Sequence, residues 1–129
     1  ALRDITNIHN GQYQASAVGE VNVVEKMKAC NAIIGGEGNG GIIYPALHYG
    51  RDALIGVALF LTQLAERKIS TKTLRDSYPN YFISKNKIQL TSEIDVDAIL
   101  STLEEKYKDE QITTIDGLKI DFKDRKSVV

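Results

Sequence analysis

The chain has 129 residues, of which 43% are hydrophobic and 26% charged, and its formal net charge at neutral pH is −1. This size suits one globular domain or parts of two small ones, and a nearly neutral chain offers no basic surface for nucleic acid. Cys30 is the single cysteine, which excludes an internal disulfide and favours the reducing cytoplasm. No apolar run is long enough for a transmembrane helix, so we expect no membrane partner.

The first third of the chain alternates helix-like and strand-like sequence. Apolar residues at helical spacing predict a short helix over residues 1–9 and another over about 21–30, ended by Asn31. A strand is expected over 13–18. Two further short and buried strands are expected over 32–35 and 41–44.

Five of the ten glycines lie in residues 35–41, the glycine loop, which reads Gly-Gly-Glu-Gly-Asn-Gly-Gly. Such a backbone can approach a ligand closely, while Glu37 and Asn39 reach toward its hydroxyl groups. A plain turn between strands is the alternative. A formal G-x-G-x-x-G match fails as a nucleotide site, because strand-like Ile42 and Ile43 follow instead of a helix.

Downstream of the loop, residues 53–67 are apolar on nearly every face, which predicts a helix buried on several sides. Asp52 precedes it in the N-cap position. A short capped helix is expected over 70–76. Alternating strands and helices predict an α/β fold with a mixed, layered sheet over residues 1–84.

From Tyr81 the pattern changes to that of a partial α+β module, assigned to residues 85–129. We expect strands over 81–84 and 87–90, then a helix that Thr91 or Ser92 caps. That helix should turn four side chains inward: Val96, Leu100, Leu103 and Tyr107. A hairpin is predicted over 112–122 around Asp116-Gly117, because Asp-Gly favours tight hairpin turns.

Both ends suggest a fragment. The chain begins in helix-like sequence without an initiator methionine, and it stops where a strand over residues 126–129 begins. We therefore expect a longer parent protein.

The order of these features resembles the α-D-phosphohexomutases, which include phosphoglucomutase, phosphomannomutase and phosphoglucosamine mutase. The resemblance rests on the glycine loop with the following Ile42-Ile43, on Gly50-Arg51-Asp52-Ala53 opening a long apolar helix, and on Val18-Gly19-Glu20-x-Asn22-Val23. It covers essentially the whole chain but only part of a family member. It implies most of the third domain over 1–84, without its first strand, and the truncated start of the fourth over 85–129.

The resemblance also implies a function. Family members interconvert hexose 1-phosphate and hexose 6-phosphate through a phosphoserine and a hexose 1,6-bisphosphate, and they use Mg²⁺. Loops carrying the phosphoserine, the magnesium ligands and the phosphate clamp are not found here, so the fragment is not expected to be catalytic alone. Asp95 and Asp97 are the only close pair of aspartates, and in a first helical turn they favour the helix dipole rather than a metal.

The loop that is present corresponds to the family's sugar-recognition loop. It implies substrate-binding roles for Glu37 and Asn39 and for three glycines of the loop, Gly36, Gly38 and Gly40. His48 and Arg51 are weaker candidates, since an arginine beside the loop can meet phosphate. Many family members have serine in place of Asn39 and histidine in place of Gly41, and this departure argues against a histidine contact to the sugar. The alternatives are a freestanding sugar-phosphate-binding or regulatory module, and a plain structural domain.

Overall fold

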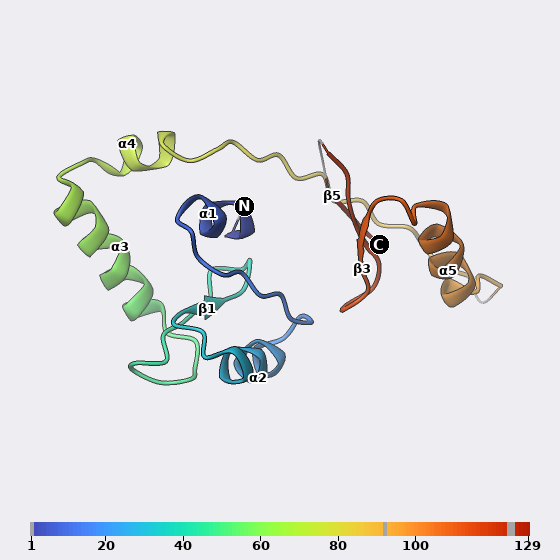
Figure 1. Cartoon of the computed structure of the whole chain (residues 1–129), viewed down its shortest axis with the longest axis horizontal. Coiled ribbons are helices and arrows are strands. Elements are labelled where there is room, and N and C mark those ends of the chain that lie inside the picture. The colour runs from blue at the N-terminus through green and yellow to red at the C-terminus, as the bar shows by residue number, and fades with distance from the viewer. Residues whose placement is uncertain (1, 92, 124–125) are drawn as a thin grey trace. The chain divides into compact units, whose positions relative to one another are not determined.

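The computed structural model describes residues 2–91, 93–123 and 126–129 (Figure 1). The chain divides into two compact units, residues 1–83 and 84–129. The expected helix start at Ala1 and the expected cap at Ser92 fall outside the described residues. Helices accompany small antiparallel sheets, so the chain is of mixed α/β type, while the layered sheet stays a prediction.

The helices of unit 1 confirm the sequence-based expectations. They are α1 Leu2–Ile8, α2 Glu20–Cys30, α3 Ala53–Arg67 and α4 Thr71–Asp76. Asn31 ends α2 in the left-handed conformation, and Asp52 and Ser70 cap α3 and α4 with their side chains. These helix ends can be predicted from sequence because a capping residue contacts backbone groups only about three or four positions away.

A two-residue ladder holds the ends of the glycine loop. Strand β1, Gly35–Gly36, pairs antiparallel with β2, Ile42–Ile43. The expected buried strand over 32–35 is wrong for its first three residues, which lie outside the ladder, and the side chain of Ile33 is 83% exposed. Ile43 is fully buried, and Met27 of α2 lies so close to Gly35 that a methyl group there would clash with its sulfur. Leu74 of α4 is also buried.

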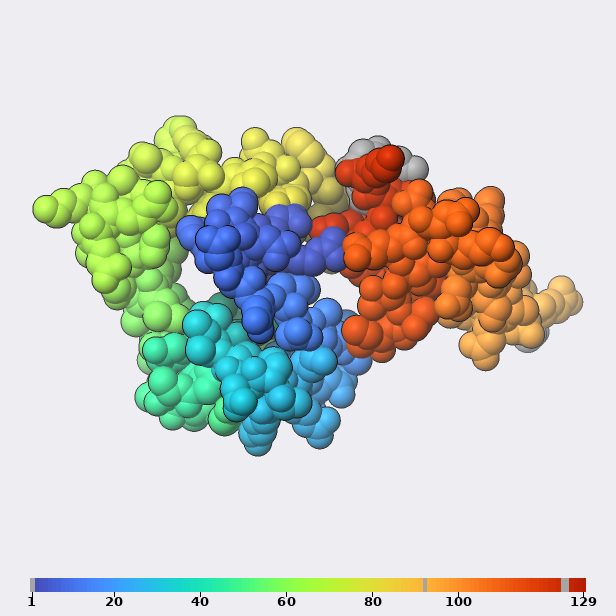
Figure 2. Space-filling view, viewed as in Figure 1, coloured from blue at the N-terminus to red at the C-terminus, as the bar shows by residue number. Residues whose placement is uncertain are grey.

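Two further expectations for unit 1 are wrong. Residues 13–18 form no strand, because a strand requires a pairing partner and none of the described segments supplies one. Helix α3 buries none of its side chains, although its sequence is apolar, and Leu54 is 81% exposed. An apolar helix buries its faces only against other elements, and α3 contacts chiefly β2 within this unit. Val57, Phe60 and Leu61 are exposed as well, and α3 is the green segment of Figure 2.

In its described residues, unit 2 has one helix and a three-stranded antiparallel sheet of order β3-β4-β5. The elements are α5 Val96–Lys106, β3 Gln111–Thr113, β4 Lys119–Asp121 and β5 Lys126–Val128. The predicted hairpin is confirmed, with Gly117 at φ +67° in its turn and β5 as the strand expected near the end. Leu118 and Ile120 are buried.

The entry into unit 2 differs from expectation. Residues 81–84 and 87–90 form no strand, because no described segment pairs with them. The cap of α5 is Asp95 rather than Thr91, since the Asp95 carboxylate accepts from the Ala98 amide at 3.0 Å.

The inward face expected of α5 is only partly formed. Leu100, Leu103 and Tyr107 are half-buried, whereas Val96 is exposed. Tyr107 closes the helix and meets Phe122 edge to face, with ring centroids 5.6 Å apart. None of the described helices is long and apolar enough to cross a membrane.

Candidate functional site

Backbone hydrogen bonds give the glycine loop a defined shape. The Glu37 amide donates to the Gly41 carbonyl at 3.0 Å, and the Gly40 amide donates to the Glu37 carbonyl at 3.1 Å. The Asn39 side-chain oxygen accepts from the Gly41 amide at 3.0 Å. The loop therefore orients the Asn39 side chain, and its oxygen already accepts a hydrogen bond within the loop.

The predicted substrate-binding glycines differ in what surrounds them. A methyl group on Gly36 would lie 2.2 Å from the Gly41 carbonyl oxygen, so the close approach of the two strands requires glycine there. Around Gly38 and Gly40 such a group would meet nothing within 4 Å, and Gly40 needs glycine for its φ of +92°. The face of the loop at Gly38 and Gly40 is open to a ligand.

Glu37 is the least exposed polar side chain of the loop's ion-pair network, at 15% exposure. One oxygen, Oε1, accepts from the Gly19 amide at 3.3 Å, and the other, Oε2, lies 3.7 Å from an Arg51 guanidinium nitrogen. Gly19 precedes the first turn of α2, where the helix dipole favours negative charge. The hydrogen bond from the Gly19 amide therefore orients the Glu37 carboxylate.

Arg51 lies beside the loop because the chain returns along β2. The Asp52 amide donates to the Ile42 carbonyl at 2.8 Å, and Ile43 forms an isolated bridge with Arg51. The stem of Arg51 then covers Gly41, where an added methyl group would lie 2.7 Å from the arginine Cδ. The structure thus brings together two of the predicted residues, Glu37 and Arg51.

Glu20, the first residue of α2, completes this cluster. Its Oε2 accepts from Arg51 Nε at 2.9 Å, and its Oε1 accepts from the Arg51 main-chain amide at 3.2 Å. Sequence reasoning missed this role. Glu20 was noted only as part of a family-like stretch, and nothing local in the sequence points to a partner 31 positions away.

His48 is engaged elsewhere. Its Nδ1 accepts from the Gly50 amide at 3.0 Å, and its Nε2 lies 3.1 Å from an Asp52 carboxylate oxygen. Because an amide can only donate, Nδ1 carries the lone pair and the proton is on Nε2, which donates to Asp52. Both ring nitrogens therefore support the start of α3 rather than the glycine loop.

The same cap shifts the acidity of Asp52. The Ile55 amide, the His48 ring and the Leu54 amide all donate hydrogen bonds that hold the pKa of the Asp52 carboxyl below its usual 3.8. The Ile55 hydrogen bond has the largest effect. Asp52 thus stays ionised as a helix cap at neutral pH.

The described residues do not fit a magnesium site. Over 2–91, 93–123 and 126–129, no three His, Cys, Asp or Glu side chains converge as metal ligands. Asp95 is used as the cap of α5. The carboxylate oxygens that Mg²⁺ prefers are therefore not gathered in this part of the chain.

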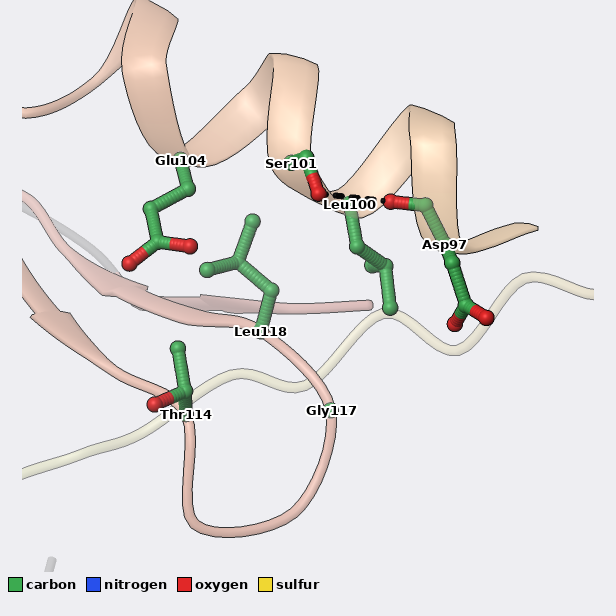
Figure 3. A pocket seen from close by; sticks show the side chains of 7 residues that line it. All are labelled: Asp97, Leu100, Ser101, Glu104, Thr114, Gly117 and Leu118. Carbon is green, nitrogen blue, oxygen red and sulfur yellow. Dashed lines mark hydrogen bonds between the residues drawn. The ribbon is translucent and has the colours of Figure 1, made fainter. Parts of the chain in front are cut away.

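A hollow in unit 2 lies between α5 and the β3–β4 hairpin (Figure 3). Leu100 and Leu118 give it an apolar floor, and the Ser101 hydroxyl donates to the Asp97 carbonyl at 2.9 Å instead of pointing to a ligand. None of the residues predicted to bind substrate lines it.

Known proteins resemble the chain over most of its length. The family model described as phosphoglucomutase/phosphomannomutase, alpha/beta/alpha domain III, matches residues 1–81. A phosphoglucosamine/phosphogalactosamine mutase of Sulfurisphaera tokodaii is 36% identical over 118 residues, which are 90% of this chain and 26% of that protein. A phosphoglucomutase/phosphomannomutase of Thermococcus kodakarensis is 33% identical over 125 residues, 95% of this chain and 27% of that protein. The chain thus spans about a quarter of the length of these relatives.

Proposed function

The chain belongs to the phosphoglucomutase/phosphomannomutase family, and from this we propose that it supplies the sugar-recognition loop of a longer phosphohexomutase. The parent would be an isomerase that interconverts hexose 1-phosphate and hexose 6-phosphate in the cytoplasm. The phosphoserine and the magnesium ion expected of this reaction would be held by other domains of the parent, since the described residues do not fit the ion.

Glu37 is the observation that carries this proposal. Its Oε1 is held by the Gly19 amide, whereas Oε2 has Arg51 only at 3.7 Å and keeps its lone pairs for a ligand. An ionised carboxylate can accept from two adjacent hydroxyl groups, such as O3 and O4 of a hexose. These positions roughly exchange when a bisphosphate intermediate turns end over end, so one carboxylate serves both orientations.

Asn39 complements Glu37. Because the Asn39 oxygen accepts from the Gly41 amide, its NH₂ group is the part that can meet a sugar. Glu37 would thus accept hydroxyl protons while Asn39 donates to a hydroxyl oxygen. The open surface at Gly38 and Gly40 lets the ring approach both side chains.

Substitution of Glu37 tests this function in the protein as its own gene encodes it. We expect Glu37→Ala to weaken binding of hexose 6-phosphates and hexose 1,6-bisphosphate about tenfold or more by titration calorimetry, because hydrogen bonds to a charged group are lost. Circular dichroism should show an unchanged fold. Glu25→Ala, an exposed position on α2, is the matched control. Full affinity in Glu37→Ala would overturn the proposal and favour a plain structural domain.

The mass of the protein isolated from its source cell separates the parent enzyme from a freestanding module. A mass about three to four times 14.3 kDa, in keeping with the relatives' lengths, would support a complete mutase. A native mass of 14.3 kDa would favour a sugar-phosphate-binding module without catalysis.

A further inference from the structure

Glu20, Glu37 and Arg51 form a cluster in which one cation lies between two carboxylates. Arg51 is 2.9 Å from Glu20 but 3.7 Å from Glu37, so it forms a hydrogen bond with the first and only a looser ion pair with the second. Glu20 also accepts from the Arg51 main-chain amide, so the two residues share two hydrogen bonds. The arginine is therefore fixed by Glu20, not by Glu37.

Two contacts position the backbone and the side-chain stem of Arg51. Its stem lies over Gly41, and its backbone is bridged to Ile43, which is fully buried. With the stem held, the guanidinium can still turn between its two carboxylate partners. Arginine presents several N–H donors in a planar fork that suits a bidentate contact with a carboxylate.

We propose that Glu20 is a positioning residue that holds Arg51 away from direct contact with Glu37 and so keeps Glu37 Oε2 available to sugar hydroxyls. This inference rests on the proposed function of Glu37. If Glu20 lost its charge, the guanidinium would turn to Glu37 and form the closer pair. A sugar would then compete with Arg51 for the same oxygen.

Glu20→Gln tests this role because it keeps the side-chain length and removes the charge. In the protein as its own gene encodes it, we expect the Kd for hexose 1,6-bisphosphate to rise about five- to tenfold. Glu25→Gln on the same helix, exposed and away from the cluster, should leave the Kd unchanged. Thermal unfolding of both variants shows whether the fold is kept.

A double-mutant cycle distinguishes positioning from a structural role. If Glu20 acts through Arg51, Glu20→Gln should change the Kd little once Arg51 is already Gln, whereas an independent structural effect would persist in that background. Equal affinity of Glu20→Gln and the unmodified protein, or an undiminished effect in the Arg51→Gln background, would overturn the inference and leave the proposed function intact. An unmodified protein that binds no hexose phosphate would overturn the proposed function and this inference with it.

Discussion

The glycine loop of unit 1 and the β3–β4 hairpin of unit 2 both reverse the chain between antiparallel strands, yet different forces hold them. In the hairpin, Leu118 and Ile120 are buried, and Leu118 exchanges two backbone hydrogen bonds with Val129. In the glycine loop, polar contacts to Gly19 and Arg51 take the place of burial. The proposed ligand role requires an exposed loop, and hydrogen bonds and ion pairs can order such a loop without burying it.

This contrast predicts that truncation of the hairpin's core has the largest effect on stability. Leu118 is 1% exposed, and Leu118→Ala should lower the free energy of unfolding by about 2–5 kcal/mol through lost burial and a cavity. Urea unfolding followed by circular dichroism measures it. The control is Val128→Ala, at a side chain that is 67% exposed, which should change stability by only about 0.5 kcal/mol. Similar losses of unfolding free energy in both variants would contradict the conclusion that burial stabilises the hairpin.

Two glycines sharpen the comparison within the loop. Gly36→Ala places a methyl group 2.2 Å from the Gly41 carbonyl oxygen, and separating these backbones should cost about 1–3 kcal/mol. Gly38→Ala meets open space and should change the unfolding free energy by about 0.5 kcal/mol or less. Chemical denaturation of both variants tests the pair. A larger loss for Gly38→Ala would show that the loop is closed where the structure has it open.

The smallest expected effect concerns Asp52, whose carboxylate caps the start of α3. Since folding lowers the pKa of Asp52 below 3.8, its contribution to stability is present above pH 3.8 and is lost as the pH falls through the lower folded-state value. Asp52→Asn can still cap α3 but does not titrate. The stability difference between the two proteins, followed by thermal unfolding from pH 6 down to pH 2, should therefore shrink toward acid. A difference that stays constant would exclude this linkage.

Helices, caps and the second hairpin could be predicted because their causes are local. The Asp52 and Ser70 caps act within one helical turn, and Asp116-Gly117 sets its own turn. The strands expected over 13–18, 81–84 and 87–90 are wrong, because strand pairing depends on segments distant in sequence. The burial of α3 was overestimated for the same reason, since an apolar pattern shows what a helix can bury but not what covers it.

In the candidate site too, the residues with a local sequence signal were predicted and the one that depends on a distant partner was not. Glu37 and Asn39 were singled out because a carboxylate and an amide between glycines are visible in seven residues. Their roles in binding stay predictions. Glu20 was missed because its partner Arg51 is 31 positions away, and opposite charges at that separation occur throughout any soluble chain. Glu20 and Arg51 meet only because the chain returns alongside β2.

The arrangement around Glu37 has a consequence for protein engineering. Its carboxylate is held from Gly19, and its neighbouring cation is held from Glu20, so the seven-residue loop does not contain its own supports. Lys28 of α2 also lies over the Tyr49 ring, at 5.0 Å from its centroid, which adds a further tie between these segments. Transplanting residues 35–41 alone into another scaffold would therefore lose the contacts from Gly19, Glu20 and Arg51 that position Glu37.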